Sequence, residues 1–289
     1  MASWCRDKFG FSDHSSSLLL TSFFFDLGYT SIFGSLLLGG TLHIAHESQR
    51  RDPDWVATYI KAQGISFLKL TPSYLHMLIE VLGEQLFAGC DLQQVLLGGE
   101  PLNYRDIRNI RQRHPDLCLF NHYGPSENTI GSCAHQITDR DIISQHQNIG
   151  RPAHNVEAFI LDRHCAVCPP YVEGDLYLAG SQLMTSYLNP QNNENRLVQW
   201  TNPQWSNKNK LIYRSGDRAY RTIDGDIIFK GREQQTVKID GYRVDLSAVQ
   251  QVIHGYRGVK DCLVDSFKRR DETVIIVALL IRQPPIIST

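Results

Sequence analysis

Residues 65–102 read ISFLKLTPSYLHMLIEVLGEQLFAGCDLQQVLLGGEPL, and this stretch decides the fold class. A predicted strand at 65–70 is followed by a predicted helix at 72–82 and by a second predicted strand at 94–97. Strands that alternate with helices of about ten residues are typical of a mostly parallel sheet with helices on both faces. The stretch therefore predicts an α/β architecture.

The same alternation extends to both sides of this stretch. Residues 18–25, LLLTSFFF, are apolar except for Thr21 and Ser22, and a mostly apolar run is typical of a strand that is covered on both faces. The other predicted elements of this region are strands at 41–45 and 117–120 and helices near 32–37, at 54–63 and at 104–113. We therefore expect a large N-terminal subdomain built on a mostly parallel sheet that is flanked by helices.

The pattern changes after Gly150 to short predicted strands that are separated by Gly, Pro and Asn turns. Asp224 and Gly225, between two apolar runs, predict a hairpin. The polar residues 189–209 predict a surface loop with at most a short helix. The last part of the chain predicts a strand, a helix and two further strands. We therefore expect a partial large subdomain at 1–233, which ends in a small β-rich section, and a truncated α+β C-terminal lobe at 234–289.

The composition excludes several classes of protein. The 289 residues are 42% hydrophobic and 20% charged, as in ordinary globular proteins, which excludes collagen-like, disordered and coiled-coil chains. The 29 Lys and Arg residues balance 30 Asp and Glu residues without a basic cluster, so no nucleic-acid surface is expected. Seven scattered cysteines do not form the short, paired framework of a secreted protein, which favours a cytoplasmic location.

Residues 18–40 are long enough to span a bilayer, and Asp26 is their only charged residue. However, only 12 of these 23 residues are Leu, Phe or Ile. Asp26 and the polar remainder offset most of the gain from inserting these side chains in a membrane. We therefore expect a buried strand followed by a buried helix, and no membrane partner.

Three turns at predicted strand ends carry residues that suit ligand binding. Gly98 and Gly99 would let a planar or phosphate-bearing ligand approach the backbone, although an ordinary tight turn also explains them. Residues 121–127, NHYGPSE, combine an aromatic ring, a hydroxyl and a carboxylate, which suit a base, a phosphate and Mg²⁺. Asp217 is suited to accept hydrogen bonds from a ribose diol, and its alternative role is that of a turn residue.

Two further groups carry weaker signals. Residues 231–243 mix cations with glycines at the boundary of the C-terminal lobe, where a solvated hinge is the alternative. Cys165 and Cys168 have the spacing of half a zinc site. Because tetrahedral zinc takes four ligands and the sequence has no second pair, no metal site is expected there.

Seven sequence blocks, taken in order, resemble amino-acid-activating adenylation domains of nonribosomal peptide synthetases. These domains belong to the adenylate-forming (AMP-binding) superfamily, which also contains acyl-CoA ligases and luciferases. The resemblance covers residues from about 11 to 281. The blocks are Phe25-Asp26, LTPSYL at 70–75, LLGGEPL at 96–102, NHYGPSE at 121–127, GDLYLAG with SYLNP at 174–190, YRSGD at 213–217 and GREQQTVKIDGYRVD at 231–245.

The resemblance implies a reaction in two steps. An amino acid and Mg-ATP would form an aminoacyl-adenylate and pyrophosphate. The aminoacyl group would then move to the phosphopantetheine thiol of a peptidyl carrier domain, in a multidomain synthetase that also holds condensation domains. ATP and Mg²⁺ are the implied cofactors of the chain itself.

The matching motifs also imply roles for single residues. The nucleotide site would contain Gly98, Gly99, Glu100, Pro101, Asn121, Tyr123, Gly124, Asp217 and Arg232. Tyr123 would lie against the base, and Asp217 would bind the ribose hydroxyls. The implied catalytic residues are Ser126 at the α-phosphate, Glu127 as the Mg²⁺ ligand, Arg232 at the ribose or phosphate edge, and Lys238. Lys238 and Gly241 would belong to the face that turns toward the site for thioester formation.

The resemblance further implies an amino-acid pocket. Its lining would be Asp26, Leu27, Thr30, Lys69, Leu96, Gly98, His122, Ile130 and Gly131. Asp26 would hold the α-ammonium group, and Lys69 and His122 would place a cation and a polar ring in an apolar cleft. Because a buried cation without an anion is costly, we expect a substrate with a side-chain carboxylate, and L-aspartate in particular. The alternative is that Lys69 pairs with a carboxylate of the protein.

The sequence departs from the family pattern at three places. The glycine-rich phosphate loop that ends in lysine does not precede Phe25, and the chain does not reach the family's C-terminal lysine. The hinge has Gln234 and Thr236 where the family has an acidic residue and a glutamine. We therefore expect an internal fragment with weak or no activity alone. The alternatives are an inactive remnant that binds nucleotide or amino acid, and an acyl-CoA ligase-like enzyme, which Asp26 disfavours because its carboxylate would repel a substrate without an amino group.

Overall fold

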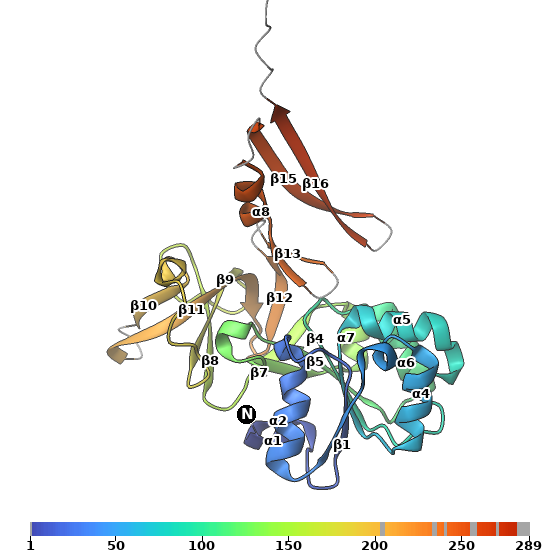
Figure 1. Ribbon diagram of the computed structural model, residues 1–289. Coiled ribbons are helices and arrows are strands. Elements are labelled where there is room, and N and C mark those ends of the chain that lie inside the picture. Colours follow the sequence, from blue (N-terminus) through green and yellow to red (C-terminus); the bar gives the residue numbers. More distant parts are fainter. Residues whose placement is uncertain are drawn as a thin grey trace, which may run out of the picture. The chain divides into compact units, whose positions relative to one another are not determined.

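The computed structural model describes residues 2–202, 206–232, 236–239, 242–254, 259–269 and 272–281. The chain divides into two units, Met1–Gly231 and Arg232–Thr289 (Figure 1). The predicted subdomain boundary between residues 233 and 234 lies outside the described residues.

A twelve-stranded sheet is the frame of the first unit (Figure 1). Its order is β2-β1-β3-β4-β5-β6-β7-β12-β11-β9-β8, and β10 pairs with β11. The pairs β1–β2, β1–β3, β3–β4 and β4–β5 are parallel, and β5–β6 and β6–β7 are antiparallel. The strands are β1 (Ser16–Leu19), β2 (Thr41–Ile44), β3 (Phe67–Leu70), β4 (Gln94–Gly98), β5 (Cys118–Tyr123), β6 (Cys133–Gln136), β7 (Asn148–Pro152), β8 (Val156–Leu161), β9 (Gly174–Gly180), β10 (Leu197–Asn202), β11 (Ser206–Arg221) and β12 (Ile227–Arg232). The predicted α/β class is confirmed.

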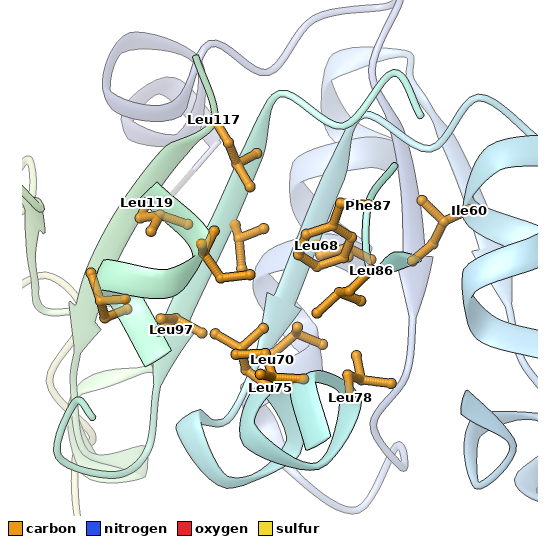
Figure 2. Close-up of a cluster of buried hydrophobic side chains, with 14 of the residues drawn as sticks. Ile60, Leu68, Leu70, Leu75, Leu78, Leu86, Phe87, Leu97, Leu117 and Leu119 are labelled. Carbon is orange, nitrogen blue, oxygen red and sulfur yellow. The ribbon is translucent and has the colours of Figure 1, made fainter. Parts of the chain in front are cut away.

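Helices cover both faces of the parallel part of the sheet. They are α1 (Ala2–Phe9), α2 (Tyr29–Leu38), α3 (Glu47–Arg50), α4 (Pro53–Ala62), α5 (Pro72–Leu82), α6 (Tyr104–Arg113) and α7 (Asp139–Ser144). Alternate residues of β3 point to opposite faces. Leu68 belongs to the main core with side chains of α4, α5 and α6 (Figure 2), whereas Phe67 belongs to a second core with Trp4 and Phe9 of α1. The α1 face of the sheet is therefore a separate, aromatic environment.

Local sequence signals set several helix ends. Asp52 caps α4 by accepting a hydrogen bond from the backbone of Trp55, and Thr71 caps α5 in the same way. A proline occupies the first turn of each of these helices, where its missing N–H costs nothing. Gly39 ends α2 in the left-handed region at φ 84°. These boundaries agree with the sequence prediction to within one or two residues.

The segment from 18 to 40 differs from the prediction. Strand β1 ends at Leu19, and the chain turns into a short 3₁₀ helix at Asp26–Gly28. The prediction of a buried strand up to Phe25 is wrong, because Phe24 is 95% exposed and its two neighbouring phenylalanines are also exposed. Phe33, Leu36 and Leu37 of α2 are exposed as well. Among the described residues, no helix is long and apolar enough to cross a membrane.

The second half of the first unit is mostly antiparallel. Gly225 has a φ of 93° in the turn between β11 and β12, which confirms the predicted hairpin. The prediction of a loop over 189–209 is wrong in part, because residues 197–202 form β10. The physical reason is Trp200, which is buried against Phe159 with ring centroids 4.8 Å apart.

The second unit contains two hairpins and one helix. Strands β13 (Thr236–Ile239) and β14 (Tyr242–Asp245) are antiparallel, as are β15 (Val259–Arg269) and β16 (Glu272–Ile281). Helix α8 (Leu246–His254) contacts β15, and the Cys262 thiol donates to the Gln250 carbonyl at 3.3 Å. Leu246 and Val264 are buried between these elements.

Candidate amino-acid and nucleotide site

Strand register brings four of the predicted pocket residues to one face of the sheet. Lys69 of β3 pairs with Leu96 of β4, and Gly98 of β4 pairs with His122 of β5. Because side chains alternate along each strand, Lys69, Leu96 and His122 share the face that α1 covers. Gly98 lies between Lys69 and His122 and has no side chain, so the Lys69 side chain crosses it and reaches the imidazole.

Lys69 and His122 are in direct contact and almost completely buried, each with 2% exposure. Lys69 Nζ is hydrogen-bonded to His122 Nδ1. Burial lowers the pKa of Lys69 to about 7, against the opposing influence of Cys5 and Asp26. Burial, and then the Lys69 charge, lower the pKa of His122 well below its usual value, so that the imidazole is neutral. Within the described ranges Lys69 forms no ion pair, and Asp26 is the carboxylate whose charge favours the ammonium form of Lys69 from a distance.

Two glycines make room for this pair. A Cβ at Gly98 would lie 2.4 Å from the His122 carbonyl oxygen and 3.4 Å from Lys69 Nζ. A Cβ at Gly131 would lie 2.4 Å from His122 Nε2. Real Cβ atoms essentially never come as close as 2.4 Å. Position 98 therefore requires glycine whichever residue stands at 122, because the close atom belongs to the backbone, whereas position 131 requires glycine while the histidine ring is present.

Helix α1 packs against the buried contact between Lys69 and His122, which the sequence analysis missed. Trp4 and Phe9 contact the His122 ring, and the buried Cys5 is an electrostatic neighbour of Lys69. Burial raises the pKa of the Cys5 thiol to about 11, so the thiol is neutral. The sequence signal that could have indicated this buried helix is the apolar character of positions 4, 5 and 9.

Asp26 and Ser126 both line an open pocket of about 410 Å³. The Ser126 hydroxyl donates a hydrogen bond to Asp26 Oδ2. The pocket is lined by Phe24, Phe25, Asp26, Tyr29, Ser126, Thr129 and Ile130. The residue predicted to hold an ammonium group therefore touches the residue predicted to meet a phosphate.

The predicted pocket residues that are not among those lining this opening are Leu27, Thr30, Lys69, Leu96, Gly98, His122 and Gly131. A Cβ at Gly99 would lie 3.8 Å from Leu27 Cδ1, so Leu27 borders the glycine turn. The Thr30 hydroxyl is buried and has no hydrogen-bond partner among the residues that the structure describes. Thr129 and Ile130 adopt positive φ angles of 51° and 75°. Such a backbone costs about 1–3 kcal/mol per residue, which is typical of segments constrained by a site.

Tyr123 and Asp217 meet on the nucleotide side. The Tyr123 hydroxyl donates to Asp217 Oδ2, and Asp217 is 1% exposed. The Ser215 hydroxyl accepts from the Asp217 backbone N–H at 3.1 Å and donates to the Leu176 carbonyl at 2.7 Å. These contacts fix a buried carboxylate beside an aromatic ring, as a ribose and a base require.

The other predicted nucleotide residues have structural partners. Glu100 accepts from the Ser73 backbone N–H at 2.9 Å and from its hydroxyl at 3.0 Å, so it ties the glycine turn to α5. Asn121 Nδ2 donates to the Asn148 carbonyl at 2.8 Å, and Pro101 is exposed. A Cβ at Gly124 would lie 2.3 Å from a neighbouring carbonyl oxygen. The turns are thus held in place by hydrogen bonds and close backbone contacts.

Glu127 is the predicted Mg²⁺ ligand. Its Oε1 accepts a hydrogen bond from the Tyr187 hydroxyl at 2.7 Å. Burial and this hydrogen bond raise the pKa of Tyr187, which therefore stays protonated as a donor. No group of three or more His, Cys, Asp or Glu side chains that could hold a metal ion occurs in the described part of the chain. A single carboxylate fits Mg²⁺ that is held mainly by nucleotide phosphates, which is the usual arrangement for this ion.

The second unit holds the last two predicted catalytic residues. Arg232 is the last residue of β12, and Lys238 lies in β13 opposite Arg243. Gly241 lies outside the described residues. Cys165 and Cys168 are both free thiols, one exposed and one buried.

Comparisons with known proteins identify the class to which this fold and site belong. The profile of the family described as AMP-binding enzyme matches residues 1–188. The chain therefore belongs to the AMP-binding enzymes, and the resemblance inferred from the seven blocks is confirmed.

The most informative relatives are nonribosomal synthetases. The chain is 36% identical over 266 residues to surfactin synthase subunit 2 of Bacillus subtilis (strain 168), covering 91% of this chain and 7% of that protein. It is 35% identical over 265 residues to bacitracin synthase 3 of Bacillus licheniformis, covering 90% and 4% respectively. A solved structure, holo-PA1221, an NRPS protein containing adenylation and PCP domains bound to a vinylsulfonamide inhibitor, matches with a TM-score of 0.84 and 29% identity, covering 94% of this chain and 46% of that chain. The chain thus spans less than half of that structure and a small part of the curated relatives.

Proposed function

We propose that the chain is part of an amino-acid-activating domain that forms L-aspartyl-AMP from L-aspartate and Mg-ATP. The aspartyl group would then pass to the phosphopantetheine thiol of a peptidyl carrier domain, beside condensation domains of a cytoplasmic multidomain synthetase. The observation that carries the choice of aspartate is the buried contact between Lys69 and His122. It is a cationic site without an ion-pair partner among the described residues.

The charges of the pocket suit both ends of aspartate. In this proposal Asp26 attracts the α-ammonium group, and Lys69 attracts the side-chain carboxylate. An ammonium and a carboxylate about 4 Å apart attract by roughly 4 kcal/mol at an effective dielectric constant near 20. Desolvation of both ions offsets part of this attraction. The remainder favours aspartate over its neutral isostere asparagine.

The nucleotide residues suit the other substrate. When bound, ATP supplies an electrophilic α-phosphorus and pyrophosphate as the leaving group. In this proposal Asp217 binds the ribose hydroxyls, Ser126 contacts the α-phosphate, and Glu127 supplies one Mg²⁺ ligand. Gly98 and Gly99 leave space for the base beside Tyr123, and Arg232 and Lys238 act from the second unit.

The test is binding of two stable adenylate analogues, aspartyl- and asparaginyl-sulfamoyl-adenosine, to the chain 1–289 by calorimetry at pH 7. The wild-type chain should prefer the aspartyl analogue. Lys69→Met should lower the affinity for the aspartyl analogue by at least about tenfold, which corresponds to about 1.4 kcal/mol of binding free energy. It should lower the affinity for the asparaginyl analogue much less.

The matched control is Lys61→Met, because Lys61 is an exposed lysine of α4. It should leave both affinities unchanged. If Lys69→Met lowers the affinity for both analogues equally, or if the wild-type chain prefers the asparaginyl analogue, aspartate is refuted as the substrate.

A further inference from the structure

Two aromatic residues of α1 pack against the His122 ring. Trp4, which is 4% exposed, stacks on the ring with centroids 5.6 Å apart and planes 27° apart. Phe9 meets the ring edge-on at 5.7 Å and 69°, and it also contacts Trp4 edge-on at 5.1 Å. Gly131 closes the remaining side, beside Nε2. The imidazole is therefore held in one orientation by contacts that no sequence motif indicated.

This orientation decides which ring atom faces Lys69. Nδ1 is the atom in contact with Lys69 Nζ. An ammonium group has only donors, so Nδ1 must accept, and a neutral imidazole then carries its proton on Nε2. A half-turn of the ring would replace Nδ1 by a carbon atom, and Lys69 would lose its acceptor.

We propose that Trp4 is a positioning residue of the amino-acid pocket, because it clamps His122 with Nδ1 toward Lys69 and so holds the Lys69 ammonium where a substrate carboxylate binds. The choice of aspartate in this inference rests on the proposed function, whereas the clamp itself does not. Trp4 acts through His122 and does not touch the substrate.

The experiment compares Trp4→Met, which keeps an apolar side chain without a ring, with Trp4→Phe, which keeps a ring. The first readout is the ¹⁵N spectrum of the histidine rings of the chain 1–289 at about pH 6, where Lys69 is an ammonium group, with the His122 signals assigned by their loss in His122→Gln. Wild type and Trp4→Phe should show one tautomer with the proton on Nε2, and Trp4→Met should show a mixture.

The second readout is calorimetry with the two sulfamoyl-adenosine analogues. Trp4→Met should weaken the aspartyl analogue by about three- to tenfold, as expected for the loss of one aromatic pair. It should weaken the asparaginyl analogue by less than about twofold, because the neutral amide depends less on the Lys69 charge. Trp55→Met is the matched control, since Trp55 stacks on Tyr59 of its own helix, and it should change neither readout.

The outcomes separate the two proposals. An unchanged His122 spectrum in Trp4→Met overturns the clamp, whatever the substrate is. A wild-type chain that does not prefer the aspartyl analogue overturns the proposed substrate, and the spectrum still decides the clamp. If Trp4→Met does not fold, Trp4→Leu replaces the ring by a branched apolar side chain instead, and an unchanged His122 spectrum in that variant overturns the clamp equally.

Discussion

Lys69 gives the pocket a charge that depends on pH within the neutral range. The groups that face it are Cys5 of α1, Asp26 of the 3₁₀ helix and His122 of β5. Burial lowers its pKa to about 7, so the empty pocket loses its positive charge above that pH. A bound carboxylate favours the ammonium form, and binding above pH 7 therefore requires the uptake of a proton.

This linkage predicts the pH dependence of aspartate binding. Affinity for aspartyl-sulfamoyl-adenosine should be constant below about pH 7 and should then fall by up to about tenfold per pH unit between pH 7 and 9. The asparaginyl analogue corrects for titration of the α-ammonium group that the two analogues share. Calorimetry in two buffers of different ionisation enthalpy should show proton uptake at pH 8 for the aspartyl analogue alone. A constant ratio of the two affinities from pH 6 to 9 would contradict this assignment.

Replacing Asp217 should lower the affinities for the two analogues in a different pattern from replacing Lys69. Two charge-assisted hydrogen bonds to a ribose diol contribute about 1.5–3 kcal/mol each, so Asp217→Asn should weaken both analogues by at least about tenfold. The ratio between them should not change, because the ribose is common to both. Tyr123→Phe removes the hydroxyl that donates to Asp217 and serves as the milder comparison. Unchanged binding in Asp217→Asn would exclude Asp217 from the ribose site.

The pocket residues could be listed from the sequence because the motifs fix their positions, but their contacts could not. That Lys69 crosses Gly98 to reach His122 depends on the register of β3, β4 and β5. Register is a property of strand pairing and is not visible in any one strand. Trp4 was missed for the same reason, since its stacking partner lies more than a hundred residues away along the chain.

At the scale of elements, His135 of β6 links α7 to the turn of the β11–β12 hairpin. His135 of β6 lies 2.8 Å from Asp141 of α7 and 3.9 Å from Asp226, measured from the ring nitrogens to the carboxylate oxygens. Asp226 also accepts from Arg151 of β7 at 3.1 Å. Burial alone would raise the pKa of Asp141, but hydrogen bonds from His135 and Thr138 outweigh it and lower the pKa to about 2.

Asp141→Asn should therefore destabilise the chain by about 1.5–3 kcal/mol at pH 7, as expected for lost hydrogen bonds to a charged group. Because the folded-state pKa lies below the unfolded value of about 3.9, this stabilisation is present above pH 4 and is lost as the pH falls toward 2. Urea denaturation of both proteins at pH 7 and pH 3 measures the difference. Asp139→Asn, at an exposed position of the same helix, is the control. A difference that does not shrink at pH 3 would contradict the role of the charge.

The helices and parallel strands were predictable because their signals are local. Asp52-Pro53, Thr71-Pro72 and Gly39 mark helix ends by hydrogen bonding and backbone geometry within a few residues. Strands β6 and β7 were missed because CAHQ and NIGRP carry neither alternation nor an apolar run. They become strands by pairing with β5 and with each other, a tertiary effect that outweighs weak local preference.

At the scale of the whole molecule, the two units divide the predicted site unequally. Every predicted pocket residue lies in Met1–Gly231, whereas Arg232 and Lys238 lie in Arg232–Thr289. Selection of the amino acid is thus a property of the first unit in this proposal. In the same proposal, Arg232 and Lys238 assign the later chemistry to the second unit.

A chain of residues 1–231 should therefore retain the wild-type ratio of affinities for the aspartyl and asparaginyl analogues to within about threefold, since distant sites contribute nearly additively. The absolute affinities should fall somewhat, because Arg232 is removed. Circular dichroism establishes that the shortened chain is folded before calorimetry is done. A folded chain 1–231 that binds both analogues equally would show that selection needs the second unit.

The close approach of Gly131 to His122 also constrains how this pocket changes during evolution. Any side chain at 131 collides with the imidazole while His122 is present, so Gly131→Ala alone is disfavoured. A smaller residue at 122 alone leaves a void and removes the acceptor of Lys69. The two positions are therefore epistatic, and a lineage that acquires a new substrate must pass through a poorly functioning single mutant or replace both residues in one recombination event. Libraries built to redirect the pocket should randomise the two codons jointly.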